Sequence, residues 1–279
     1  RPGRDGHPPV QTGRPNMTTF ASPFQPVKIF GDESSSVHSL RAKLSIDILA
    51  AGCIDAFCEF FTLSHRAPVM IDPIAETYFS VPQDKLVIIK DLLVRAEELM
   101  RNSDFREIYN IYKQIADYFE SEKDIQTALY YHTLGQKLAK RSADTLLEGV
   151  AHENIGKVYE RLGQTENALK SHEAHLSLAD ASKDPVEMEK ARKQLWNVYV
   201  KIAKDNEGQQ NYNDACIFYE KALKTAKATN DKQLIAKSSF YLGRIYEKLD
   251  DFMASMEHQE QYTQLCEQLS DVKGKASAQ

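Results

Sequence analysis

The sequence predicts an all-α protein, an α-α superhelix of stacked helical hairpins. Two recurring markers carry this prediction. Small residues, each followed by a predicted helix, recur at separations of 40, 47 and 40 residues: Ala128, Ala168, Ala215 and Ser255. Aspartates recur at the same separations: Asp144, Asp184, Asp231 and Asp271. A fixed period of this length is the signature of a helical solenoid, an architecture that presents extended surfaces to other proteins.

The composition is that of an ordinary folded protein and disfavours several classes of ligand. Of the 279 residues, 42% are apolar and 27% are charged, with a net charge of −5. The basic and acidic residues are interspersed, whereas nucleic-acid binding needs a concentrated basic surface. No apolar run approaches the roughly 20 residues of a membrane span, and no signal peptide is recognisable. We therefore expect neither a nucleic acid nor a membrane as partner.

The cysteine pattern favours reduced thiols in a cytosolic protein. None of the four cysteines forms a CxxC pair, and three of them lie within apolar helical patterns. We therefore expect packed thiols, not disulfides or a metal centre. The four are Cys53, Cys58, Cys216 and Cys266.

Residues 1–37 contain six of the ten prolines and are predicted to form an extended or disordered arm. Met17 follows a stretch rich in Arg, Gly and Pro, and one interpretation makes it the true start. Phe20, Phe24 and Phe30 could dock along a partner or along the solenoid itself; the alternative is a tail without contacts.

Residues 38–103 are predicted to hold two long helices joined by a proline-rich linker at 66–82. The first helix, 38–65, has apolar residues on more than one side, so it needs cover on more than one side. Its own chain or another subunit could supply that cover. For a partner contact we select Phe57, Phe60 and Phe61. The second helix spans about 84–100.

Four helical hairpins are predicted over 104–271. The third unit is longer than the others, and its polar stretch 205–210 is expected to form an extended turn and a candidate protrusion. Residues 272–279 resemble the start of a further, incomplete repeat, so we expect further sequence or a partner at that end. The predicted helix pairs are 104–120 with 124–141, 146–162 with 165–181, 185–207 with 211–229, and 231–249 with 252–269.

Small residues are expected where the two helices of a hairpin cross, Gly156 with Ala168 and Gly243 with Ser255. A bulky residue at Gly156 would overpack the crossing, at a cost of ~1–3 kcal/mol or more. Tyr and Leu residues at the recurring helical spacing are interpreted as core between hairpins. These residues are Tyr112, Phe119, Ile155, Tyr159, Tyr219, Leu242 and Tyr246.

No motif for catalysis or for a bound cofactor is present. The sequence has no HExxH, no phosphate-binding glycine loop and no recognisable nucleophile set. A metal site at His152, His172 and His175 is conceivable. However, His132 and His172 both stand four residues after the small residue of their repeat, which favours a packing role. We therefore predict a protein that is not an enzyme and has no metal, cofactor or small-molecule substrate.

The repeat resembles the tetratricopeptide repeat (TPR), although the units here are longer than usual. Co-chaperones of that class hold a terminal carboxylate with Lys and Asn side chains on the first helices of successive repeats. The matching face here is Lys113, Asp117, Asn154, Lys157, Lys201 and Lys237. Asp117 stands where Asn would be expected and would repel a carboxylate. This face supports an alternative function, a soluble adaptor that binds peptide tails in the manner of co-chaperones or intraflagellar-transport proteins.

Four segments resemble the tetratricopeptide repeat protein 29 family: 45–63, 84–97, 115–124 and 153–164. The more specific parts are the helices before the array, 45–63 and 84–97, and the stretch from Tyr118 to Asp124, because the repeats themselves are generic. The resemblance implies a scaffold of the motile-cilium axoneme. Its implied partners are the tail of an inner-arm dynein heavy chain, a companion TPR protein and other axonemal subunits. Its expected location is the cytoskeleton of the cilium or flagellum.

Overall fold

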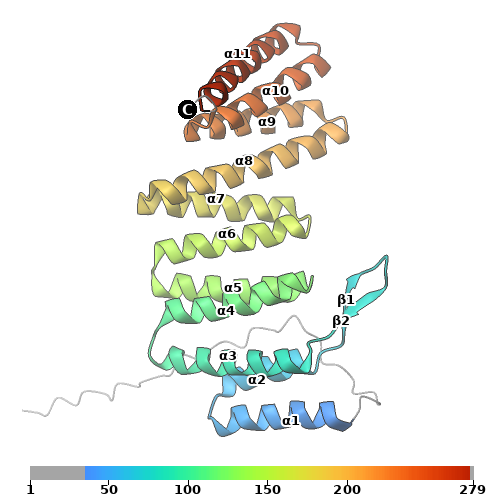
Figure 1. The fold of residues 1–279 in the computed structure, drawn as a ribbon, viewed down its shortest axis with the longest axis vertical. Helices are drawn as coiled ribbons and strands as arrows, with labels where there is room; N and C mark the ends of the chain where they lie inside the picture. The colour runs from blue at the N-terminus through green and yellow to red at the C-terminus, as the bar shows by residue number, and fades with distance from the viewer. Residues whose placement is uncertain (1–34, 277–279) are drawn as a thin grey trace, which may run out of the picture.

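The computed structural model describes the backbone of residues 35–276 and the side chains of residues 40–270. The helices form an elongated stack in which each packs mainly on its neighbours along the chain (Figure 1). The predicted all-α class is confirmed, since one short β-hairpin is the exception among the described residues. No helix of this part combines the length and apolar character that crossing a membrane requires. The helices are α1 (Ser35–Ala50), α2 (Ile54–Ser64), α3 (Gln83–Arg101), α4 (Phe105–Ser121), α5 (Ile125–Ser142), α6 (Thr145–Arg161), α7 (Thr165–Ser182), α8 (Pro185–Gly208), α9 (Tyr212–Thr229), α10 (Lys232–Lys248) and α11 (Phe252–Ala276).

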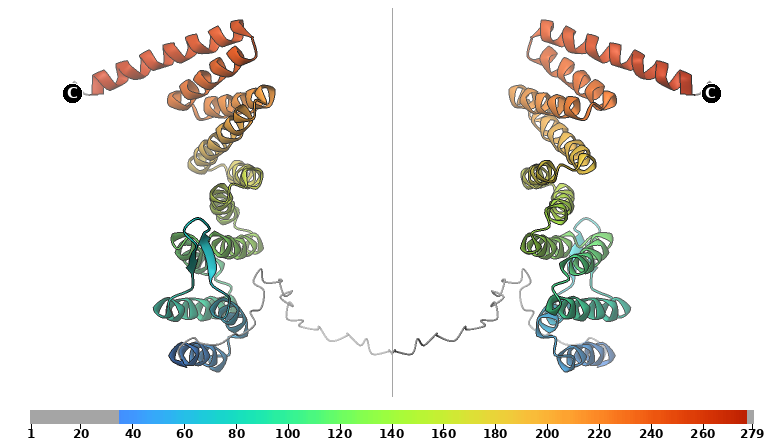
Figure 2. Two further views of the ribbon diagram at one scale, coloured as in Figure 1. Left: turned by 90° about the vertical axis from the view of Figure 1, so that its right-hand side faces the viewer. Right: turned by 90° about the vertical axis from the view of Figure 1, so that its left-hand side faces the viewer.

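Three of the recurring aspartates are helix N-caps. The carboxylates of Asp144, Asp184 and Asp231 accept hydrogen bonds from backbone N–H groups at 3.0, 2.9 and 3.0 Å. Each bond satisfies a donor that the first turn of a helix leaves unpaired. Asp271 differs because α11 continues through it, so the helix break expected before 272–279 is absent. In a view turned by 90°, α11 extends outward from the stack (Figure 2).

The turns of the array share one backbone device. Immediately before each N-cap stands a residue with φ between 54° and 70°, which reverses the chain in two or three residues. This left-handed conformation suits glycine, yet other residue types occupy all but one of these positions. The residues are Ser103, Lys123, Ala143, Gly163, Lys183, Gln210, Asn230 and Asp250.

The longer third unit lengthens a helix instead of a turn. Helix α8 has 24 residues, whereas α4, α6 and α10 have 17 each. The additional residues are therefore about two helical turns. The protrusion predicted at 205–210 was wrong, because α8 continues to Gly208 and the turn to α9 is as short as the others. Near the end of α8, Glu207 accepts hydrogen bonds from Tyr219 and Arg244.

The first predicted helix is two helices. Gly52, with φ of 72°, ends α1, and the change of direction alters which side chains are buried. Ile48 and Cys53 are buried, whereas Ile46 and Ile54 are exposed. The prediction of one unbroken helix over 38–65 was therefore wrong.

The segment predicted as an irregular linker contains an antiparallel β-hairpin. Strand β1 (Val69–Asp72) pairs with β2 (Thr77–Phe79), and the hairpin projects from the side of the stack (Figure 1). In its turn, Asp72 Oδ1 accepts hydrogen bonds from the backbone N–H groups of Ile74 and Ala75 at 2.9 and 3.1 Å. The strands were missed because each is too short to show a pattern.

Glutamates near the ends of three first helices tie their hairpin to the next. Glu160 is 2.6 Å from His172 Nε2 within its hairpin, and its backbone oxygen accepts a bond from Lys201 Nζ in the next. In the third unit, Glu207 bonds Tyr219 and Arg244 in the same arrangement. In the first unit the members are Glu120, His132 and Arg161. The packing role predicted for His132 and His172 agrees with this geometry.

Candidate protein-binding surface

Four of the six residues predicted to line a peptide-binding face are engaged within the protein. Lys113 pairs with Asp117. Asn154 Nδ2 donates to Tyr109 Oη at 3.0 Å, and Lys157 Nζ donates to Glu153 at 2.5 Å. Burial raises the pKa of Tyr109 to about 12. These side chains would have to exchange internal bonds for bonds to a peptide.

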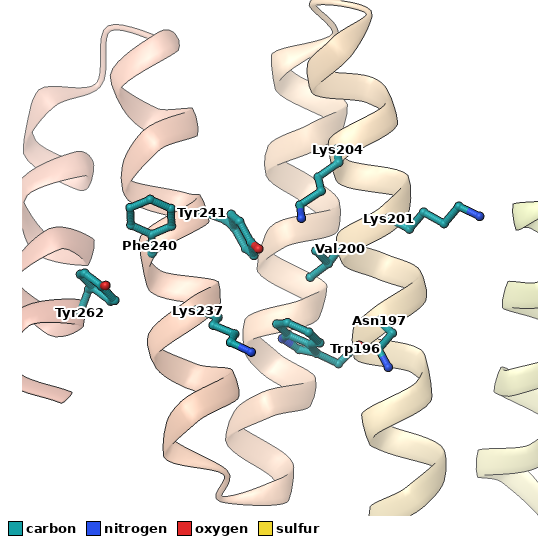
Figure 3. Close-up of a pocket in the computed structure, with 9 residues that line it drawn as sticks. All are labelled: Trp196, Asn197, Val200, Lys201, Lys204, Lys237, Phe240, Tyr241 and Tyr262. Carbon is teal, nitrogen blue, oxygen red and sulfur yellow. The ribbon is translucent and has the colours of Figure 1, made fainter. Parts of the chain in front are cut away.

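The other two predicted lysines border a groove between α8 and α10 (Figure 3). This open groove has a volume of about 490 Å³. Lys237 points across it from α10, whereas Lys201 points away, toward the backbone oxygen of Glu160 at 3.4 Å. The remaining lining residues are Trp196, Asn197, Val200, Lys204, Phe240, Tyr241 and Tyr262.

A second hollow of about 420 Å³ continues the groove along the same two helices. The two parts share Lys204 and Tyr241, and the second adds Arg244 and Lys248. Glu207 is the acidic residue of this lining, and the Arg244 guanidinium lies 3.2 Å from it. We call the two parts together the α8/α10 groove; its charge is basic although the whole chain is acidic.

Most lining residues of the α8/α10 groove were missed in the sequence, although a signal is present. Lys237, Tyr241, Arg244 and Lys248 follow one another at intervals of four, three and four residues, so they share one face of α10. The intervals mark a helix face that is not apolar enough for the core. The charged and aromatic residues on this face of α10 would have identified it as a candidate binding surface.

The phenylalanines predicted to contact a partner have different environments. Phe60 is 0% exposed and belongs to the core, so it is not available to a partner as predicted. Phe57 is half-buried against the same core, and Phe61 is 46% exposed and stacks on His65. Phe20, Phe24 and Phe30 lie outside the described residues.

Comparison with known proteins agrees with the repeat architecture. The tetratricopeptide repeat model matches residues 151–186, from within α6 through α7 to the start of α8. Tetratricopeptide repeat protein 29 of Trypanosoma brucei brucei is 34% identical over 82% of this chain. The chain belongs to the tetratricopeptide repeat protein 29 family. The human protein of that name is 24% identical over 84% of the chain.

The chain spans about half the length of these relatives, 47% of the trypanosome protein and 52% of the human one. Among solved structures, a chain of TPR-like repeats from Podosopora anserina has 12% identity and a TM-score of 0.45, covering 86% of this chain and 99% of that one.

Two clusters in this TPR array have the residue types of a metal site, but protein groups already bind their carboxylates. Glu153 is 2% exposed and has Lys157 Nζ and Lys190 Nζ each at 2.5 Å. Gln194 Nε2 also donates to it at 2.9 Å. The cluster with His175 and Glu187 is therefore a charge-balanced network that joins α6, α7 and α8. The other cluster, Asp117, Glu120 and His132, is paired with Lys113 and Arg161.

Proposed function

We propose that this chain is a non-catalytic TPR scaffold of the motile-cilium axoneme. It tethers an inner-arm dynein tail to neighbouring subunits or to the doublet microtubule. Membership of the tetratricopeptide repeat protein 29 family supports the proposal. A stack of paired helices with exposed side chains along its length suits a tether, because it spans a distance and offers separate surfaces.

The observation that carries the scaffold function is the apolar surface of the N-terminal helices. Ile46 and Ile54 are 64% and 65% exposed, and Phe61 is also exposed. Large apolar side chains that are exposed in one region of a protein are typical of a protein-binding surface. We propose that the dynein tail or a companion TPR protein covers α1 and α2.

Crosslinking mass spectrometry on intact cilia tests the proposal. Crosslinks from 38–65 and 252–270 should reach an inner-arm dynein heavy chain and its neighbours. A variant with Ile54→Ser and Phe61→Ser should be released from axonemes at lower salt than wild type. Val186→Ser, at a position that is 69% exposed on α8, is the matched control and should be retained. Crosslinks confined to non-axonemal chains would refute the proposal.

A second candidate function is an adaptor that binds peptide tails, of co-chaperone or intraflagellar-transport type. The α8/α10 groove favours it, because Lys237 is available there. The engagement of Lys113, Asn154 and Lys157 within the protein counts against a clamp of the co-chaperone kind. Charge reversal at Lys113 distinguishes the two modes, since Lys113 does not line the α8/α10 groove and its reversal should abolish peptide binding only in a clamp.

A further inference from the structure

The α8/α10 groove has cations without carboxylate partners. Lys204 and Lys237 point into the space between the two helices (Figure 3). Within residues 40–270, no carboxylate forms an ion pair with Lys204, Lys237 or Lys248. Arg244, by contrast, is paired with Glu207 in this lining. The groove therefore concentrates uncompensated positive charge on a chain whose net charge is −5.

Aromatic rings lie among these cations. Lys204 Nζ is 4.9 Å from the centroid of the Tyr241 ring, and that ring stacks on Tyr219 at 5.1 Å. Phe240 is 41% exposed, and its ring centroid is 5.3 Å from that of Tyr262 on α11. Phe240 and Tyr262 thus offer an apolar contact beside the lysines, at the edge of the groove.

Hydrogen bonds join α8 to α10 at the floor and at one end of the groove. The Trp196 indole is nearly buried, and its Nε1 donates to Ser238 Oγ at 2.8 Å, which links α8 to α10. At the other end, Glu207 accepts from Tyr219 and Arg244. Because these bonds hold the two helices in place, a ligand would meet a preformed surface and would pay little ordering cost.

From these observations we infer that the α8/α10 groove binds an acidic segment of a partner protein, with carboxylates on Lys204 and Lys237 and an apolar side chain on Phe240. Charge complementarity selects the acidic partner. Two adjoining hollows of about 490 and 420 Å³, both open, suit several residues of a peptide better than one enclosed small molecule. One partner of the proposed scaffold is thus a protein with an acidic segment. That this partner belongs to the axoneme rests on the proposed function.

Trp196 provides the measurement, because it is the single tryptophan of the chain and lines the groove. The full chain is titrated with a capped ten-residue peptide of six glutamates, two phenylalanines and two glycines. Tryptophan emission should change on binding, and the affinity should fall as salt rises. The same peptide with glutamine in place of glutamate should not bind.

Two charge-matched variants locate the site. K204Q/K237Q should bind the acidic peptide at least about tenfold more weakly, since it loses two charge-assisted contacts. K170Q/K224Q removes the same charge from exposed positions on α7 and α9 that do not line the groove, and it should bind as wild type. An equal loss in both variants, or no loss in the first, would overturn the inference. So would equally tight binding of a single-stranded DNA oligonucleotide, which would indicate a site for phosphates.

Photo-crosslinking gives a readout that does not depend on the variants folding. A benzophenone in place of one phenylalanine of the peptide should form its adduct at Phe240 or Tyr262; adducts elsewhere would contradict the inference. Acidic-peptide binding without axonemal crosslinks would refute the proposed function alone. Axonemal crosslinks with unchanged peptide binding in K204Q/K237Q would refute the groove alone.

Discussion

The imidazole of His172 lies directly against the backbone of Gly156. A β-carbon added to Gly156 would come within 2.5 Å of His172 Cε1, which is closer than real contacts allow. His172 is held there by Glu160, 2.6 Å from Nε2. Glycine at this position therefore makes room for the buried His172 ring and its hydrogen bond to Glu160, which joins the two helices of the hairpin.

Gly156→Ala should lower the free energy of unfolding by about 1–3 kcal/mol, because it overpacks this crossing. In a His172→Ala background the ring is absent, and the same change should be neutral or stabilising by up to about 1 kcal/mol through helix propensity. Urea denaturation of the four proteins of the cycle measures the coupling. Equal effects of Gly156→Ala in both backgrounds would show that the ring is not the obstacle.

The left-handed turn residues offer a stabilising change. Ala143 and Lys183 are exposed, with φ of 54° and 56°. Glycine should relieve strain of about 1–2 kcal/mol, offset in part by the larger entropy of the unfolded chain. We expect Ala143→Gly and Lys183→Gly each to raise the free energy of unfolding by about 0.5 kcal/mol, measured in urea. Gly163→Ala is the reverse control, because φ is 70° there and nothing crowds the site; it should destabilise.

The array was predictable because its packing is local. Repeated small residues and aspartates located the helix pairs to within one residue, except that α11 continues to Ala276 where an end at 269 was predicted. Three of the aspartates proved to be N-caps. The break in the first helix was missed because Gly52 stands within an apolar run, where composition alone does not show a reversal. The strands of the hairpin need cross-strand pairing, which a single segment of sequence does not display.

The candidate surfaces were harder to predict than the helices. Sequence spacing placed Lys201 and Lys237 on first helices, and both border the α8/α10 groove. It could not show that Lys201 turns toward Glu160, nor that Lys113 and Lys157 pair within their own helices, because these outcomes depend on side-chain contacts. For the same reason the burial of Phe60 escaped prediction.

The buried charge network at Glu153 predicts a pH dependence. Burial alone would raise the pKa of Glu153, but hydrogen bonds and charge from Lys157 and Lys190 outweigh it and lower the pKa from 4.5 to about 2. Because the pKa of Glu153 is lower in the folded state, its ionised carboxylate stabilises the fold at pH values above its unfolded pKa of 4.5. This stabilisation is lost as the pH falls toward about 2.

Glu153→Gln should therefore lower the free energy of unfolding at pH 7 by on the order of 2 kcal/mol. It should also flatten the loss of stability between pH 4.5 and about 2. Denaturant titrations at several pH values provide the measurement. Glu189→Gln, which removes an exposed pair with Lys193, should change stability by less than about 0.5 kcal/mol at any pH. Parallel pH curves for wild type and Glu153→Gln would contradict this account.

A buried ion pair joins the N-terminal helices to the first hairpin. Arg66, after α2, contacts Asp124 at 2.6 Å, and their side chains are 6% and 1% exposed. Its guanidinium also donates to Thr127 at 2.5 Å and lies 5.2 Å from the centroid of the Phe119 ring. Asp124 is itself the N-cap of α5, so the pair couples the cap to the preceding helices.

Arg66→Met should destabilise the protein by about 3–5 kcal/mol, because it leaves a buried carboxylate without its cation. Hydrogen exchange should show the loss of protection concentrated in α1, α2 and the β-hairpin, while α8 to α11 stay protected, since coupling along a solenoid is local. The control is Arg95→Met, whose pair with Glu107 is exposed and whose loss should cost less than about 1 kcal/mol. If the two variants unfold at the same urea concentration, the pair does not hold the N-terminal helices to the array.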